Sequence, residues 1–291
     1  MVTEETLGVY SMKSWHLKNR AAGFTLIEML VVAPIVILLI GTIIYAIVQL
    51  TGDALSERAS AELINDVHSS LDRIESDTKV SGAFLATNNM PLTSPQGSDD
   101  STANFTSVTS GDDVLILNTF VTDANPNDPN RSLVYLANMP NSCASANLEQ
   151  NQVMTMNTVY FTKANSSGVN ELWRRTLAVN GYASRDCSGV TPWQRPSCTP
   201  GLTGTMCQAQ DELLLSGVSE FSIEYFNAAS DTSPSAAAQN TTITTRQTAM
   251  DLTDTIQVTL KAEATSAGRD IAQQGTIRVT RVGALITYAT P

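Results

Sequence analysis

The sequence predicts an α+β protein in which one long N-terminal helix covers an antiparallel sheet. Three observations predict this fold class. A near-continuous apolar run begins near residue 24, an amphipathic helical pattern follows it, and short segments of β character fill the remainder. With 291 residues, the chain can bury a real core in its β-rich part alone.

The apolar run from Phe24 to Leu50 is long enough to cross a bilayer. Its 27 residues exceed the roughly 20 needed to span about 30 Å of hydrocarbon. They also exceed the about 7 to 15 apolar residues of a signal peptide. The only charge in this run is Glu28. Because an ionised side chain in hydrocarbon is costly, an acid there indicates a functional group with a partner.

A short basic flank precedes the run and predicts its orientation. Lys13, Lys18 and Arg20 lie just before it, and cations beside a first membrane helix hold that end in the cytoplasm. We therefore expect a single-pass protein of the cytoplasmic (inner) membrane, with its N-terminus inside and its larger part outside. On topology alone, the alternative is an ordinary membrane-anchored protein with a positive flank inside.

The helix is expected to continue beyond the membrane, to about Lys79. Apolar residues recur four apart after Gly52, which predicts one buried face against a sheet. A helix over 24–79 would be roughly 84 Å long. Pro34, Gly41 and Gly52 are where it could bend. The expected buried stripe consists of Leu55, Ala59, Leu63, Ile64, Val67, Leu71 and Ile74.

From about Val80 the composition changes to that of a β-rich domain. Residues 87–113 are rich in Ser, Thr, Asn, Asp and Gly and predict a long surface loop. Later segments alternate apolar and polar residues and are separated by turn residues, which favours antiparallel sheet. The expected strands are 114–121, 132–137, 153–162, 171–179, 218–226, 254–264 and 275–282.

The residues GFTLIE, Gly23 to Glu28, resemble the processing site of type IV prepilins and of type II secretion pseudopilins. In that family a prepilin peptidase cuts after the glycine and methylates the new N-terminal Phe. The resemblance implies a cleaved leader at 1–23, a long helix at 24–79 whose residues 24–50 lie in the membrane before assembly, and a head at 80–291. It also implies the pilin fold and incorporation into an extracellular or periplasmic filament. Its implied partners are prepilin peptidase, other pilin subunits and an inner-membrane assembly platform.

Glu28 has a specific role in this interpretation. Cleavage creates a cationic amine on Phe24, which shares a helix face with Glu28. Between neighbouring subunits, the carboxylate would meet the amine of the next Phe24, since two paired charges largely offset their cost in an apolar bundle. Such a pair would also set the register between subunits. The alternative is a glutamate that snorkels to the membrane interface.

Later segments resemble PilW-like minor pilins and J-type pseudopilins, which initiate or cap filaments. The similar features are LWRRT at 172–176, a strand carrying Gly217, Val218, Phe221 and Tyr225, and two late strands with IQVTL and IRVTR. A major pilin is less favoured, because a repeated subunit is usually smaller.

Four cysteines, Cys143, Cys187, Cys198 and Cys207, all lie in the expected head. An even number outside the cytoplasm predicts up to two disulfides, with three possible connectivities. A Cys187–Cys198 bond, for example, would close an irregular loop and stabilise it by about 2 to 4 kcal/mol. A zinc site is disfavoured, because the expected head has no CxxC and no histidine.

The sequence predicts neither an enzyme nor a bound cofactor or metal. It has no motif for nucleophilic or phosphate-binding chemistry, and its two histidines lie in the leader (His16) and in the amphipathic pattern (His68). DANPNDPN, 123–130, starts like a calcium loop but lacks its sixth-position Gly and twelfth-position Glu, so a turn is expected. A membrane-tethered enzyme with an unrecognised site is one of the alternatives.

The net charge of −11 disfavours direct binding of nucleic acid and favours solubility outside the cell. The leading hypothesis, implied by the resemblance of the segment 23–28, is a structural filament subunit. The main alternative is a membrane-tethered extracytoplasmic adhesin or binding protein that does not polymerise.

Overall fold

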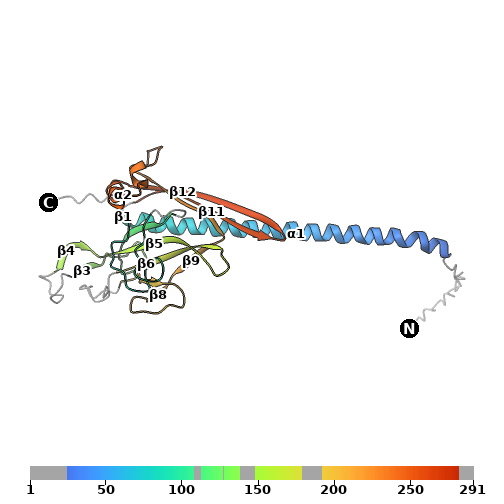
Figure 1. Ribbon diagram of the computed structural model, residues 1–291, viewed down its shortest axis with the longest axis horizontal. Helices are drawn as coiled ribbons and strands as arrows, with labels where there is room; N and C mark the ends of the chain where they lie inside the picture. Colours follow the sequence, from blue (N-terminus) through green and yellow to red (C-terminus); the bar gives the residue numbers. More distant parts are fainter. Residues whose placement is uncertain (1–24, 108–112, 127, 138–147, 179–191, 282–291) are drawn as a thin grey trace, which may run out of the picture. The chain divides into compact units, whose positions relative to one another are not determined.

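The computed structural model describes residues 25–107, 113–126, 128–137, 148–178 and 192–281 (Figure 1). The chain divides into two compact units, Met1–Gly52 and Asp53–Pro291. One helix, α1 (Leu26–Lys79), contributes to both units and is 54 residues long. The expected α+β class and the single long N-terminal helix are confirmed.

In the first unit, α1 is apolar and exposed on every side. It is helical throughout, with Pro34 inside it. The hydroxyls of Thr42 and Thr51 donate to the carbonyls of Leu39 and Ile47, at 2.8 and 2.7 Å. These polar groups therefore have partners within the helix, as a segment in hydrocarbon requires.

The second unit contains two antiparallel sheets beside the rest of α1. The first has five strands in the order β1-β2-β5-β6-β9, and the second has three in the order β10-β11-β12. The first comprises β1 (Ser81–Phe84), β2 (Leu115–Phe120), β5 (Thr155–Ala164), β6 (Asn170–Leu177) and β9 (Glu212–Ser216). The second comprises β10 (Val218–Phe226), β11 (Thr255–Ser266) and β12 (Arg269–Thr280).

Smaller elements complete this unit. β3 (Tyr135–Ala137) pairs with β4 (Leu148–Val153), and β7 (Ser197–Cys198) runs parallel to β8 (Ala209–Gln210). A 3-10 helix, η3 (Ala236–Gln239), and the helix α2 (Ile243–Met250) lie between β10 and β11.

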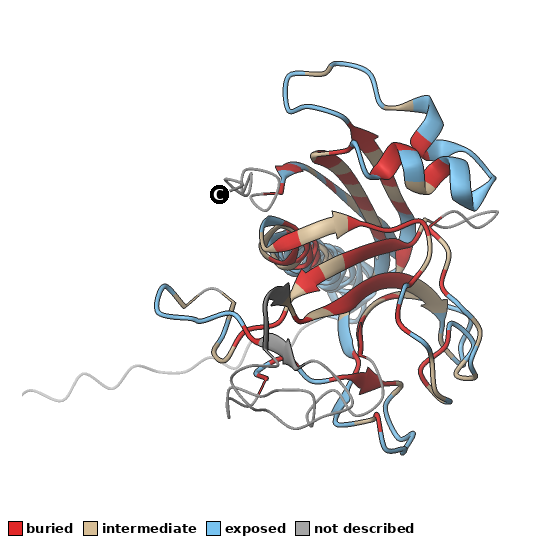
Figure 2. Ribbon diagram, turned by 90° about the vertical axis from the view of Figure 1, so that its left-hand side faces the viewer, coloured by how far each residue is buried: buried red, intermediate tan, exposed pale blue. Residues whose placement is uncertain are grey.

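The main core lies where α1 meets both sheets. Leu63, Val67, Leu71 and Ile74 of α1 are buried in one cluster with apolar residues of the two sheets. Figure 2, coloured by burial, shows the buried residues gathered on the strands beside this helix. Gly275 of β12 permits the contact, because a Cβ there would lie 2.6 Å from Leu71 Cδ1. The expectation that the amphipathic half covers a sheet is confirmed.

A single glycine connects β9 of the first sheet to β10 of the second. Gly217 lies between β9 and β10 with φ +78°, and a Cβ on it would lie 2.2 Å from the carbonyl oxygen of Glu263. Its own carbonyl accepts the N–H of Glu263 at 2.7 Å. Only glycine combines this conformation with this close approach, so β10 begins without a loop.

Two expectations from the sequence are wrong. Leu55 is 56% exposed, so the packed face of α1 begins at Leu63, later than predicted, and Ile64, 37% exposed, is not part of the buried face. Every expected strand segment contains a strand, but β1, β4, β7, β8 and β9 were missed, as was α2. β1 has only four residues and β9 lacks the alternation of a half-buried strand, so the pattern was weak in both.

Candidate functional site: the exposed apolar half of the N-terminal helix

The largest apolar surface in the described part of the chain belongs to the first half of α1. Its side chains from Leu26, 84% exposed, to Leu50, 73% exposed, form an almost unbroken apolar cylinder. The sequence dictates this, because a helix that is apolar all round has no polar face to present to water. α1 is the one described helix long and apolar enough to cross a membrane. Such a surface fits lipid or other apolar helices.

Glu28 closes the first turn of this helix. One carboxylate oxygen accepts the Thr25 N–H at 3.0 Å and the Thr25 hydroxyl at 2.9 Å, while the Glu28 N–H approaches the Thr25 hydroxyl at 3.3 Å. This is a capping box, which satisfies donors that a helix start leaves without partners. A carboxylate at this end is also favoured by the helix dipole. Glu28 therefore has partners within its own helix.

The sequence contained this signal, but our interpretation missed it. Thr25 and Glu28 stand three residues apart at the start of the apolar run, which is the pattern of a capping box. The other predicted residues of the processing and assembly site, Gly23 and Phe24, lie outside the described residues. The proposed pair between Phe24 and Glu28 therefore stays a prediction.

One disulfide is present in the described part of the head. Cys198 and Cys207 are bonded, with their Cα atoms 5.2 Å apart. This corrects the example of a Cys187–Cys198 bond, because Cys198 already has a partner. Cys187 and Cys143 lie outside the described residues. The loop that this bond closes connects β7 to β8. The bond therefore stabilises a turn that contains little regular secondary structure.

A buried ionic cluster lies next to this loop, and the sequence did not predict it. Arg175 of β6 is fully buried, and its guanidinium contacts Asp211 at 2.7 Å and Asp100 at 3.0 Å. It also donates to the Thr199 hydroxyl at 2.6 Å and to the Gly97 carbonyl at 2.6 Å. Its donors are thus shared among separate loops, so the cluster fixes those loops to β6.

Asp100 is held in its charged form. Partial burial opposes the charge, but hydrogen bonds from Lys163, Thr199 and Arg175 outweigh it and lower the pKa of Asp100 to about 2. Both carboxylates of the cluster accept hydrogen bonds from neighbouring side chains. The arrangement supports a structural role rather than proton transfer near neutral pH.

A second polar cluster attaches the end of α1 to the five-stranded sheet. Asp77 accepts hydrogen bonds at 2.7 Å from both the Tyr160 hydroxyl and Arg174 Nε. Burial, followed by the Asp77 charge, raises the pKa of Tyr160 well above its ordinary value. The tyrosine therefore remains a neutral donor, and the helix end is fixed between β5 and β6.

The described residues contain no group of three His, Cys, Asp or Glu side chains placed to hold a metal ion. In the segment 123–130, Asp123 accepts the Ser132 N–H at 2.7 Å and Asp128 accepts the Asn130 N–H at 2.8 Å. These carboxylates bond to nearby backbone, as the side chains of a turn do. Comparison with known proteins found no matching family model, no matching curated protein and no matching solved structure.

Proposed function

We propose that this chain is a minor pilin or pseudopilin. It would insert in the cytoplasmic membrane through the first half of α1 and then enter a type IV pilus-like filament, initiating or capping it. One observation carries the proposal: an apolar half-helix, exposed on every side and with a single acid in its first turn, continues into a half with one face buried against a β-rich head. Lipid before assembly and neighbouring helices afterwards would both cover that surface.

Maturation would follow the processing of type IV prepilins, whose cleavage site the segment 23–28 resembles. Prepilin peptidase would cut between Gly23 and Phe24, and removal of 23 of the 291 residues would leave 268. The methylated amine of Phe24 would then lie one residue from the capping box. Transfer of the subunit from membrane to filament would require an assembly platform in the same membrane.

The capping box also favours a second candidate. Because Thr25 already supplies hydrogen bonds to Glu28, the acid does not need another subunit to be satisfied. A membrane-tethered adhesin or binding protein that does not polymerise would fit the same geometry. In the filament proposal, the bonds to Thr25 stabilise the acid in the inserted monomer, and a neighbouring amine supplies the opposite charge at assembly.

Mass spectrometry of the native protein tests the maturation step. The proposal expects an N-terminus at a methylated Phe24. A functional native chain that retains residues 1–23 would contradict the proposal.

Three substitutions separate charge pairing from capping at Glu28. Glu28→Gln keeps a side chain that can complete a capping box but removes the charge, whereas Thr25→Ala keeps the charge and removes the hydroxyl. We expect Glu28→Gln and Glu28→Ala to be lost from sheared filaments while their membrane levels stay normal. Thr25→Ala should be incorporated. Normal incorporation of Glu28→Gln would refute the pairing role and leave capping as the function of this acid.

A further inference from the structure

Side chains cover most of the free strand edges of the two sheets. Along β1, the Gln247 amide accepts the Ala86 N–H at 2.8 Å and donates to the Phe84 carbonyl at 3.3 Å. The Arg281 guanidinium donates to the Gly82 carbonyl of the same edge. These groups take the place of a neighbouring strand.

The edge of β10 is covered in the same way. The Asp113 carboxylate accepts the Ile223 N–H at 2.7 Å, and Gln239 donates to the Ile223 carbonyl at 3.0 Å. The Ser235 N–H donates to the Tyr225 carbonyl at 2.7 Å. On β9, the Leu214 carbonyl accepts the Ser70 hydroxyl at 3.1 Å.

The pattern at β10 also fixes which groups β12 presents. Because Ile223 and Tyr225 point their backbone groups away from β11, the even-numbered residues 222, 224 and 226 make the bonds to β11. By the register of β10, β11 and β12, the odd-numbered residues of β12 then bond to β11. The N–H and C=O groups at the outer edge belong to Asp270, Ala272, Gln274, Thr276, Arg278 and Thr280.

This outer edge is open among the described residues. β12 has 12 residues and is the last strand of its sheet, so its edge is about 40 Å long at 3.4 Å per residue. Among the described residues, no group bonds to the outward N–H and C=O groups of this strand, although the Arg278 side chain donates to the Asp231 carbonyl. A long, unprotected strand edge is a template for the addition of another strand.

An apolar groove lies beside the first residues of β12. It measures about 480 Å³ and runs between Ile271 and the helix residues Ser60, Ala61 and Ile64. The odd-numbered residues of β12 face α1, as Gln273 shows by donating to Ser60 at 2.9 Å. A strand added at this edge would place every second side chain over this flank of α1.

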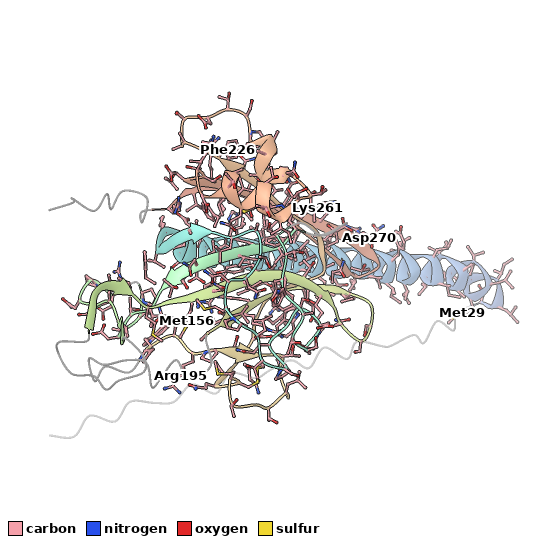
Figure 3. All side chains as sticks on the ribbon, turned by 60° about the vertical axis from the view of Figure 1, so that its left-hand side comes forward. Met29, Met156, Arg195, Phe226, Lys261 and Asp270 are labelled. Carbon is pink, nitrogen blue, oxygen red and sulfur yellow. A yellow bond between two sulfur atoms is a disulfide. The ribbon has the colours of Figure 1, made fainter. Side chains whose placement is uncertain are left out.

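The charges at the groove favour a basic occupant. Glu57 and Asp270 line it, and within the described chain neither forms an ion pair. The cation beside them, Arg269, is already paired with Asp53 at 2.6 Å. Figure 3 labels Asp270 near the turn between β11 and β12, and Phe226 at the other end of the same sheet.

We propose that the outer edge of β12 binds an extended segment of a partner protein. The segment would add as a fourth strand, with apolar side chains over α1 and a lysine or arginine near Glu57 and Asp270. This inference goes beyond the filament role and does not depend on polymerisation.

A second copy of the chain is a poorer occupant. β12 runs in the same direction as α1, because Arg269 lies at Asp53 while Gly275 lies at Leu71. A symmetric pair of copies joined along this edge would have antiparallel strands, and their helices would then leave in opposite directions. Two such copies could not both be anchored in one bilayer through α1.

The test uses the full chain, labelled with ¹⁵N, in detergent micelles, and a synthetic seven-residue peptide. The peptide alternates isoleucine or valine with threonine and carries one terminal lysine. We expect saturable binding that slows hydrogen exchange at the even-numbered amides of residues 270–280. The odd-numbered amides should be protected with or without peptide, because β11 already binds them.

Matched variants identify the edge as the site. Ala272→Pro removes one outward N–H, and proline is tolerated at an edge position whose N–H faces solvent, whereas Ala272→Val keeps that N–H. We expect Ala272→Pro to weaken binding about five- to tenfold, as the loss of one hydrogen bond predicts, and Ala272→Val to bind normally. The same peptide carrying N-methyl groups on alternate amides should not bind.

Three results would overturn the proposal. The first is no protection of the even-numbered amides at about 1 mM peptide, the affinity range of weak complexes. The second is equal binding by Ala272→Pro and Ala272→Val. The third is even-numbered amides that are already protected in the free chain, because another part of the chain or a second copy would then occupy the edge.

Discussion

The contact between Leu71 and Gly275 predicts a strong energetic coupling between α1 and β12. Leu71 is 1% exposed, so Leu71→Ala should lower the free energy of unfolding by about 2 to 5 kcal/mol, as cavity-forming substitutions do. Gly275→Ala should by itself cost about 1 to 3 kcal/mol through overpacking. Its new methyl group would lie 2.6 Å from Leu71 Cδ1 and 3.0 Å from Val67 Cγ1.

The double variant should be more stable than the sum of the two single changes predicts. Leu71→Ala removes the atom that the new Cβ would meet, so the Gly275→Ala methyl group can occupy part of the cavity. We expect a coupling of about 1 to 3 kcal/mol, within the range of residues in direct contact. Leu55→Ala is the matched control, because Leu55 lies on the same helix and is 56% exposed; it should change stability by less than about 0.5 kcal/mol.

The stability changes of the single variants and their coupling are measured by guanidinium and thermal unfolding of the full chain in detergent. Tryptophan fluorescence and near-UV circular dichroism follow the unfolding. For a unit of about 240 residues, a loss of about 3 kcal/mol lowers the Tm by roughly 6 to 12 °C. Additive single changes, or equal effects of Leu71→Ala and Leu55→Ala, would refute the packing of α1 against β12.

Three further predictions follow from the head. Gly217→Ala should cost more than about 2 kcal/mol, because it combines a positive φ with a backbone clash; a chemical unfolding midpoint equal to the wild type would contradict this. Tyr160→Phe should cost about 1 to 3 kcal/mol through loss of a hydrogen bond to a charged group, and unchanged urea unfolding would rule out that contribution. Because hydrogen bonds hold the pKa of Asp100 near 2, below the ordinary 3.8, its contribution is present above about pH 4 and is lost as the pH falls to 2. The stability difference between the wild type and Asp100→Asn should therefore shrink between pH 5 and pH 2, and a constant difference would show that the Asp100 charge contributes nothing.

The local patterns predicted the elements well where one periodicity was strong. The stripe at Leu63, Val67 and Leu71 predicted the buried face of α1. The alternation of apolar and polar residues in 218–226 and 254–264 predicted β10 and β11. The same reasoning failed at Leu55 and Ile64, because an apolar stripe does not reveal how far along the helix, or how far around it, the covering surface extends.

The candidate site was predicted only in part. Its apolar length and its lone acid are local features that the sequence displays. The hydrogen bonds of Glu28 to Thr25 were missed, although the spacing of the two residues is that of a capping box. The pairing of Cys198 with Cys207 was one of several possibilities, and only the positions of the two backbones decide it.

The sequence by itself determined that a long apolar helix, with one acid at its start, precedes a β-rich domain. These features depend on neighbouring residues, and periodicity and hydropathy encode them directly. The tertiary structure decided which contacts form across the chain. Arg175 meets Asp100 and Asp211, Gly275 admits Leu71, and β12 is left as an open edge. The two contacts join residues far apart in the sequence, and the open edge depends on the order of strands in the sheet. No local pattern records either.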